Sequence, residues 1–279
     1  MLRAKKRPPS SQPSSAKVDD SDWGTKKPSE IVNHRSFVFY GRSGTGKTTL
    51  AASFPGPTLL LDINDKGTDS IADADHVDVK QLQTWDEFEE IYWKLKRNPS
   101  RYNTVVIDTV SQLQTLAMTH VLTVKGKTSD DPGKWGVMTK QEWGDTSSLM
   151  KTWLTNYRDL DCNTAFLAQD RDFTNEDEEA PEGQILMPEI GPQLMPSVAK
   201  VLNAAVFVIG NTFIRQRIIE SPIAGKPGKK QRKEKIEYCL RIGPNPVYIT
   251  KVRKPKSFIA PAQIVDPTYE AIMEIIKGE

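Results

Sequence analysis

A glycine-rich octapeptide between a short apolar run and a helix-forming stretch constrains this chain more than any other feature. Residues 36–40 form a run of mainly β-branched and aromatic side chains that predicts a buried strand, and residues 47–53 predict a short helix. The octapeptide is Gly41-Arg42-Ser43-Gly44-Thr45-Gly46-Lys47-Thr48, which matches the pattern G-x-x-x-x-G-K-[ST]. In such a loop, consecutive backbone N–H groups point at phosphate oxygens, and the helix amino terminus adds positive potential. The sequence therefore predicts a phosphate-binding loop.

The side chains at the end of this loop indicate a nucleoside triphosphate with a divalent cation. Lys47 is expected to reach the β- and γ-phosphates, and Thr48 is expected to ligate Mg²⁺. Asp108 ends the apolar run 104–108, and there it predicts the carboxylate that holds Mg²⁺ through water. No Asn-Lys-x-Asp segment is present to read guanine, which favours ATP. The predicted nucleotide-binding residues are Gly41, Arg42, Ser43, Gly44, Thr45, Gly46, Lys47, Thr48 and Thr49.

Hydrolysis also requires a group that orients or deprotonates the attacking water. Asp62, Asn64 and Asp65 follow the second predicted strand and are candidates, although a turn before Gly67 explains the same residue types. Gln169 ends the run 164–168 beside the expected nucleotide pocket. Its amide is a candidate sensor of the γ-phosphate.

Strands and helices alternate through the first two thirds of the chain. Apolar runs at 36–40, 58–62, 104–108 and 164–168 are separated by helical patterns, among them an amphipathic helix that begins with a capping box at Thr84 and Glu87. The runs 204–210, 213–220, 236–242 and 247–252 predict successive strands with short loops. This order predicts an α/β fold with a mostly parallel sheet, helices on both faces and antiparallel hairpins at one edge near the C-terminus.

Composition divides the chain into three parts. Residues 1–30 are rich in Pro, Ser and Lys and predict a basic, disordered tail, residues 31–265 predict the α/β core, and residues 266–279 predict a C-terminal helix. The longest apolar stretch, 201–209, is shorter than the roughly 20 residues of a membrane-spanning helix, so no membrane partner is expected. Cys162 and Cys239 lie far apart and are expected to be reduced, buried thiols in a cytoplasmic protein.

Three further segments carry clusters of charged residues. Residues 176–183 are acidic and poorly suited to bind a polyanion. Residues 226–235 are basic, and they are compatible either with phosphate binding or with a solvated hairpin tip. A further basic cluster, with Lys251 and Arg253, follows the last predicted strand, where it could reach a neighbour's nucleotide.

The chain resembles the RecA-like P-loop ATPases, and within them the phage single-strand annealing recombinases with a minimal RecA core. The resemblance runs in order from about residue 35 to 260 through the phosphate loop, Leu60-Leu61-Asp62, Val105-Val106-Ile107-Asp108-Thr109-Val110, Phe166-Leu167-Ala168-Gln169 and Val247-Tyr248-Ile249-Thr250-Lys251-Val252-Arg253.

The resemblance implies a RecA-like ATPase core that binds single-stranded DNA and promotes annealing or strand exchange, in the cytoplasm of a bacterial host. It implies that Gln169 couples the γ-phosphate to a DNA-binding stretch between 170 and 196. It also implies that Lys251 and Arg253 act on the nucleotide of an adjacent protomer in a ring or filament. Two departures are notable: the acidic residues within the presumed DNA-binding stretch, and Asn64 where the family has a water-activating glutamate.

Because an amide cannot accept a proton, turnover is expected to be slow unless Asp65 substitutes for that glutamate. The alternative is a nucleotide-dependent assembly or binding module with little hydrolysis.

Overall fold

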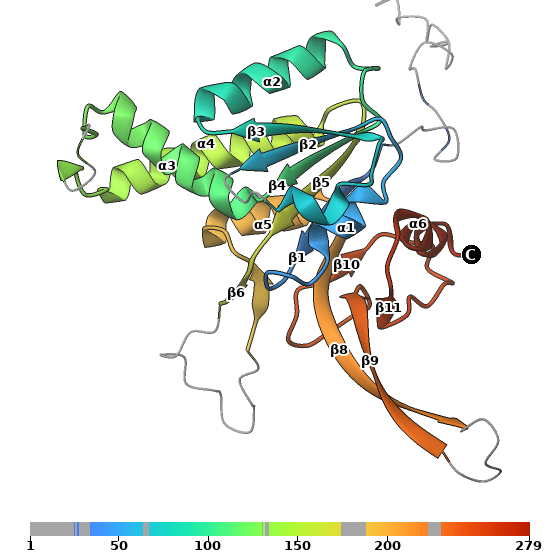
Figure 1. The fold of residues 1–279 in the computed structure, drawn as a ribbon. Helices are drawn as coiled ribbons and strands as arrows, with labels where there is room; N and C mark the ends of the chain where they lie inside the picture. Colours follow the sequence, from blue (N-terminus) through green and yellow to red (C-terminus); the bar gives the residue numbers. More distant parts are fainter. Residues whose placement is uncertain are drawn as a thin grey trace, which may run out of the picture. The chain divides into compact units, whose positions relative to one another are not determined.

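One large sheet organises the chain. The computed structural model describes residues 25, 27, 34–63, 67–129, 131, 134–173, 188–222 and 230–279. Among these residues, nine strands form a sheet in the order β11-β9-β8-β1-β5-β4-β2-β3, with β10 also paired to β8 (Figure 1). Its strands are β1 (Ser36–Tyr40), β2 (Thr58–Ile63), β3 (Val77–Leu82), β4 (Thr104–Asp108), β5 (Asn163–Ala168), β8 (Val208–Pro222), β9 (Lys230–Arg241), β10 (Lys251–Val252) and β11 (Gln263–Val265). A separate two-stranded sheet contains β6 (Asp170–Asp172) and β7 (Ile190–Pro192).

The strands from β8 to β3 run parallel, as the α/β prediction requires, whereas β9, β10 and β11 are antiparallel additions. Helices connect the parallel strands because such strands need a crossover. The helices are α1 (Lys47–Ala52), α2 (Trp85–Arg97), α3 (Val110–Val124), α4 (Lys140–Arg158), α5 (Pro196–Ala205) and α6 (Tyr269–Lys277), with a 3₁₀ helix η3 (Thr68–Ile71). The predicted fold class is confirmed.

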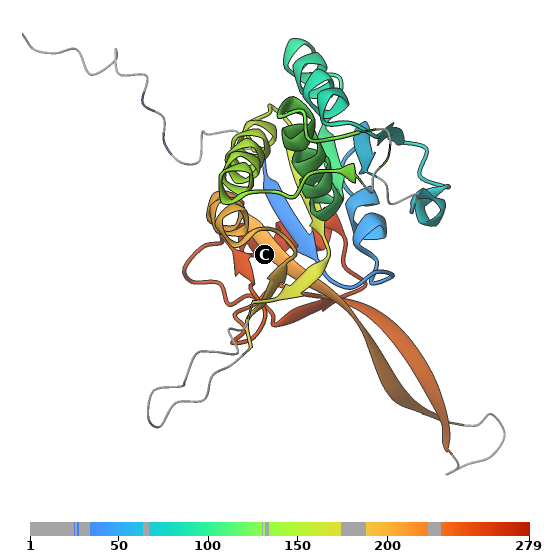
Figure 2. The same cartoon turned by 90° about the vertical axis from the view of Figure 1, so that its left-hand side faces the viewer.

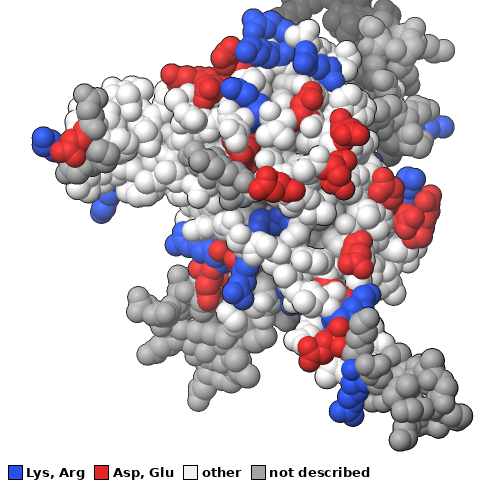
Figure 3. All heavy atoms as spheres, viewed as in Figure 1, with Lys and Arg blue, Asp and Glu red and all other residues white. Residues whose placement is uncertain are grey.

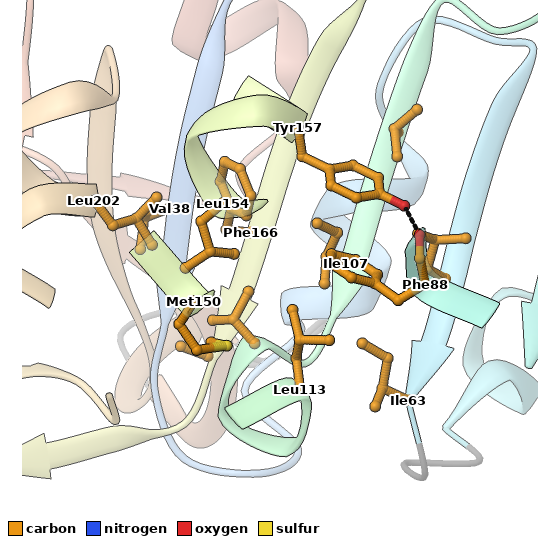
Figure 4. Packing of buried hydrophobic residues seen from close by; sticks show 14 of the residues in the cluster. Val38, Ile63, Phe88, Ile107, Leu113, Met150, Leu154, Tyr157, Phe166 and Leu202 are labelled. Atoms are coloured by element: carbon orange, nitrogen blue, oxygen red, sulfur yellow. Dashed lines mark hydrogen bonds between the residues drawn. The ribbon is translucent and has the colours of Figure 1, made fainter. Parts of the chain in front are cut away.

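The two faces of the sheet are covered by different helices. Alternate residues of β1 point to opposite faces, so Val38 packs with α2, α3, α4 and α5, whereas Phe37 packs with α1, η3 and α6. Figure 4 shows the first of these cores, where Phe166 and Ile107 from the sheet meet Leu154 from α4. Fully buried side chains fill both cores. This packing holds the strands, and the loops that follow them, in place.

Several helix boundaries follow from local signals. Thr84 accepts a hydrogen bond from the Glu87 backbone and Glu87 bonds back, so the predicted capping box forms and α2 starts at Trp85. The same reciprocal pair, Thr139 and Glu142, starts α4. Thr268 caps α6, which begins at Tyr269 and packs into the second core.

The C-terminal third departs from the sequence prediction. Residues 204–210 and 213–220 were expected to form two strands, but α5 occupies 196–205 and one uninterrupted strand, β8, occupies 208–222. Pro196 favours a helix start, and Val198 and Leu202 form a helical apolar face. No turn forms at Asn211 and Thr212, because their side chains are buried and donate hydrogen bonds to the Tyr40 carbonyl.

Other strand lengths also differ from the prediction. β9 starts at Lys230, so the last residues of the basic segment 226–235 belong to a strand. Of the predicted strand 247–252, Lys251–Val252 forms the short strand β10, and Tyr248 forms an isolated parallel bridge with Ile190. The short edge strands β3 and β11 were not predicted. β8 and β9 pair from Asn211 with Arg241 to Pro222 with Lys230, and Figures 1 and 2 show this hairpin projecting from the rest of the sheet as a long arm.

Apart from residues 25 and 27, the tail predicted for residues 1–30 lies outside the described residues, as does the acidic stretch 176–183. Both stay predictions, as do the limits proposed for the core and the C-terminal helix. Both cysteines are buried free thiols, as expected. Among the described residues, no helix is long and apolar enough to span a bilayer.

Candidate nucleotide site

The glycine-rich loop starts at the carboxyl end of β1, in the interior of the sheet. The Gly41 backbone N–H donates to the Ala168 carbonyl at the end of β5 (3.3 Å), which ties the start of the loop to the neighbouring strand. A side chain at Gly41 would place its Cβ 2.3 Å from the Thr212 carbonyl of β8, so only glycine fits there. The loop is therefore held between β5 and β8.

Lys47 lies inside the curl of this loop. Its Nζ donates to the carbonyls of Gly41 (2.8 Å) and Arg42 (2.9 Å), and the residue is 7% exposed. Gly46, the residue before it, has a φ of 85°, in the left-handed region that favours glycine. The ammonium group is thus positioned at the loop, where it can neutralise phosphate charge.

Thr48 of α1 meets Asp108 at the end of β4, as a metal site requires. Thr48 Oγ1 donates to Asp108 Oδ2 at 2.8 Å, and Asp108 is 3% exposed at the end of β4. A hydroxyl that can ligate Mg²⁺ directly and a carboxylate that can hold the ion through water suit an Mg²⁺ ion that is also bound by nucleotide phosphates. These residues fit Mg²⁺. Among the described residues, no group of three or more His, Cys, Asp or Glu is placed to hold a metal.

A cavity of about 660 Å³ opens at the loop. It is large enough for a nucleotide, since ligand pockets usually measure about 300–1,000 Å³. Its walls come from the phosphate loop, α1, η3, the end of β5, the arm and the turn before α6. The lining residues are Ser43, Gly44, Thr45, Gly46, Lys47, Thr48, Thr49, Leu50, Ser53, Gly67, Ser70, Gln169, Tyr238, Asp266, Pro267 and Thr268.

One wall of the cavity was missed by sequence reasoning. Tyr238 of β9 places its Cδ1 3.4 Å from the position of a Cβ on Gly46, and the Asp266 backbone N–H donates to the Tyr238 carbonyl (2.7 Å). Both residues line the cavity, so an aromatic ring and a carboxylate stand beside the phosphate loop. The alternation in β9 predicts only that Tyr238 shares a face with Ile236, because the pairing of the last strands is a long-range property.

Gln169 lies in the cavity wall. Its backbone N–H donates to Ser111 Oγ (3.1 Å), and its carbonyl accepts from the Gln193 backbone (2.7 Å). Gln193 follows β7, and β6 starts at Asp170, the residue after Gln169. The cavity is thereby joined directly to the small β6–β7 sheet.

Lys251 and Arg253 do not reach this cavity in their own chain. Lys251 pairs with Ile209 near the start of β8, whereas the phosphate loop follows the carboxyl end of β1. Lys251 Nζ donates to the carbonyls of Asn203 and Ala204 (both 2.8 Å), and Arg253 Nη2 donates to Ala204 (3.2 Å). Burial, and secondarily the neighbouring guanidinium, lowers the pKa of Lys251.

Of the candidates for water activation, only Asp62 can be placed. It is 2% exposed, accepts a hydrogen bond from Gln81 Nε2 (3.4 Å), and lies beside Asp108 in the β2–β4 register. Asn64 and Asp65 lie outside the described residues, so their predicted roles stay predictions.

A family of known proteins matches most of this chain. Residues 33–253 match the family described as AAA domain. The chain matches none of the curated proteins. Among solved structures, a KaiC-like protein from the hyperthermophilic archaeon Pyrococcus horikoshii OT3 aligns with 84% of this chain and 89% of its own, at 13% identity and a TM-score of 0.38. Because the family match spans most of the chain and includes the phosphate loop, Lys47, Thr48 and Asp108, this chain is a P-loop ATPase of the AAA-domain family.

Proposed function

We propose that this chain binds ATP with Mg²⁺ and hydrolyses it in an assembly of identical subunits, a ring or filament, that acts on single-stranded DNA. Its role would be to promote annealing or strand exchange in phage recombination. The contact between Thr48 Oγ1 and Asp108 Oδ2 carries the nucleotide part of the proposal, because it joins the phosphate loop to the carboxylate of β4 at 2.8 Å.

The residues of the site have distinct tasks in this proposal. Backbone N–H groups of the loop and the Lys47 ammonium hold the phosphates, while Thr48 and Asp108 hold Mg²⁺, which when bound neutralises charge that develops on the phosphates. Asp62, beside Asp108, adds a second buried carboxylate at the same edge of the sheet. Asp65 remains the proposed group that activates water, with slow turnover if it does so poorly.

Two observations support coupling to DNA and to assembly. Gln169 lines the cavity, and its backbone continues into β6, so a change at the γ-phosphate has a short covalent route to the stretch 170–196. Lys251 and Arg253 lie away from their own phosphate loop, on the amino-terminal half of the sheet. Such a position suits cations that act on the nucleotide of a neighbouring subunit.

The test compares the full-length protein with Lys47→Ala. We expect calorimetry to detect ATP·Mg²⁺ binding by the wild type and not by Lys47→Ala, and we expect single-stranded DNA to accelerate wild-type hydrolysis. Lys96→Ala on α2 is the control, because it removes the same charge from an exposed helix. Equal hydrolysis rates with and without DNA, together with no retention of DNA on a filter, would refute the DNA-dependent ATPase. Tight ATP binding with negligible hydrolysis under all conditions would instead favour a nucleotide-dependent assembly module.

A further inference from the structure

The arm formed by β8 and β9 has two chemically different faces. In an antiparallel pair, residues directly opposite each other place their side chains on the same face. One face pairs Ile214 with Tyr238 and continues through Ile236 and Ile218, all exposed. The other face begins one residue further along each strand and again takes every second residue. That face carries Arg215 opposite Glu237 and Arg217 opposite Lys235.

This second face, formed by Arg215, Arg217, Lys235 and Glu237, is called the cationic face here. Arg215 Nη2 lies 2.6 Å from Glu237 Oε2, and Lys235 Nζ lies 3.6 Å from Glu237 Oε1. The Glu237 side chain is only 4% exposed, and its hydrogen bond from Arg215 lowers its pKa, so the carboxylate is charged at neutral pH. One carboxylate therefore serves two cations and leaves the face with a net positive charge.

Arg217 adds a third cation to this face. Arg217 and Lys235 occupy directly opposed positions on the two strands, and both are exposed. Like charges directly opposite each other destabilise a sheet pair. Within the part of the chain that the structure describes, no carboxylate lies within ion-pair distance of Arg217, whose electrostatic partner is the shared Glu237. An external anion between these two side chains would remove the repulsion.

The regular spacing of cations on the cationic face suits a ligand that carries charges at regular intervals. Side chains on one face of a strand recur every two residues, or about 6.8 Å, so Arg215 and Arg217 present charges in a row along β8. Figure 3 shows Lys and Arg side chains on the described part of the arm, with acidic side chains among them. A row of cations on a projecting, exposed ribbon suits the phosphate backbone of a single strand.

The segment between 170 and 196, for which the family resemblance implies DNA binding, is a weaker electrostatic candidate. The described strand β6 carries Asp170 and Asp172 on either side of a single cation, Arg171, and Glu189 precedes β7. Carboxylates at this density repel phosphates.

The root of the arm contacts the phosphate loop. Thr212 Oγ1 lies 2.7 Å from Thr45 Oγ1 at a buried hydrogen bond, and the Asn211 side chain donates to the Tyr40 carbonyl (3.2 Å) just before the loop. Tyr238 of the other strand packs beside Gly46. Both strands of the arm thus connect a ligand bound on the arm to the nucleotide cavity.

We propose that the cationic face of the arm is a binding site for the phosphate backbone of single-stranded DNA. This inference rests on the DNA-binding part of the proposed function and assigns it to Arg215, Arg217 and Lys235. Loss of two phosphate contacts should reduce the slope of log affinity against log salt by about 1.4, which corresponds to about 25-fold weaker binding at 0.1 M salt.

The experiment measures binding of a fluorescent oligothymidine by anisotropy at several salt concentrations. The test variant of the full chain is Arg217→Ala with Lys235→Ala. The matched control is Lys96→Ala with Arg97→Ala, which removes the same charge from the exposed end of α2. We expect the reduced slope and about 25-fold loss only in the arm variant, near-normal binding in Arg217→Lys, and unchanged ATP binding by calorimetry in all variants.

Three outcomes would overturn the inference, and they are distinguishable. If the wild type binds ATP but no oligothymidine, the DNA-binding part of the proposed function falls together with the arm site. If the wild type binds DNA and the arm variant binds it equally well, the site on the arm is wrong while the DNA-binding function stands. If the arm variant instead dissociates in sedimentation velocity with unchanged DNA binding per subunit, the cationic face contacts an acidic surface of a second copy.

Discussion

The pairing of Thr48 with Asp108 makes a sharp prediction about Mg²⁺. Replacing Asp108 by Asn keeps an oxygen that can accept the Thr48 hydroxyl hydrogen bond, which is 2.8 Å long, and changes the buried volume little. The substitution removes the negative charge at a site that is 3% exposed, where solvent screens weakly. The fold should therefore persist, and the loss should fall on the metal.

The magnitude follows from the outer-shell role expected for Asp108. Loss of a residue that holds a metal through another ligand usually costs about 10–100-fold in metal affinity, which is about 1.4–2.7 kcal/mol. We expect Asp108→Asn to shift the Mg²⁺ concentration that supports half-maximal ATP binding upward by this factor, measured by calorimetry at fixed ATP. In the presence of EDTA, the affinity for ATP should differ far less between Asp108→Asn and the wild type.

The control for this experiment is Asp69→Asn. Asp69 is an exposed carboxylate next to Ser70 in the cavity wall, so its removal changes the local charge without touching the Thr48 contact. An Mg²⁺ dependence of Asp108→Asn equal to that of the wild type, in a folded protein, would refute the assignment of the metal site. A shift of the same size in Asp69→Asn would show that only general electrostatics is involved.

Three further outcomes follow from individual contacts. Tyr238→Ala should weaken ATP binding by about 1–3 kcal/mol if the ring stacks on the base, and Tyr238→Phe should not; equal affinities in a titration would refute stacking. Burial raises the pKa of Cys162 to about 12, so this thiol should resist maleimide at pH 8 until the protein is unfolded, as mass spectrometry would detect. The Lys127 ammonium, 2.5 Å from Glu142, holds the pKa of that carboxyl at about 2, below its ordinary 4.5. The contribution of the Glu142 carboxylate to folding stability is therefore present above about pH 4.5 and is lost as the pH falls through 2. Glu142→Gln should flatten that part of the acid unfolding curve.

The parallel half of the fold could be predicted because its signals are local. β1 and β4 coincide with the apolar runs 36–40 and 104–108, and α2 begins at the capping box of Thr84. The phosphate loop is specified by consecutive residues, and its attachment to a strand and a helix is visible in the sequence. That is why Lys47, Thr48 and Asp108 could be named before their distances were known.

The antiparallel half depends on contacts between distant segments. Asn211 and Thr212 have the composition of a turn, yet their side chains bond to Tyr40 about 170 residues earlier and allow β8 to continue. Tyr238 and Asp266 become cavity residues only through the pairing of β9 with β8 and the backbone contact between Asp266 and Tyr238. Periodicity gives the face of such a side chain, but not the partner opposite it.

The placement of Lys251 and Arg253 limits how hydrolysis could depend on assembly. Within one chain, both side chains donate to the last carbonyls of α5, on Asn203 and Ala204, where the helix leaves acceptors unsatisfied. These contacts favour cations through the helix dipole, typically by about 0.3–1 kcal/mol at an exposed site. A triphosphate in the cavity of a proposed neighbour carries full negative charges and would compete well with such weak acceptors. Since the same residues lie at the opposite end of β1 from their own phosphate loop, they can act on a nucleotide only when a second subunit presents it.

Alanine at either position, Lys251 or Arg253, should therefore lower hydrolysis at high protein concentration while leaving ATP binding by the isolated subunit intact. An equal loss of ATP binding would show that these cations support the fold rather than catalysis.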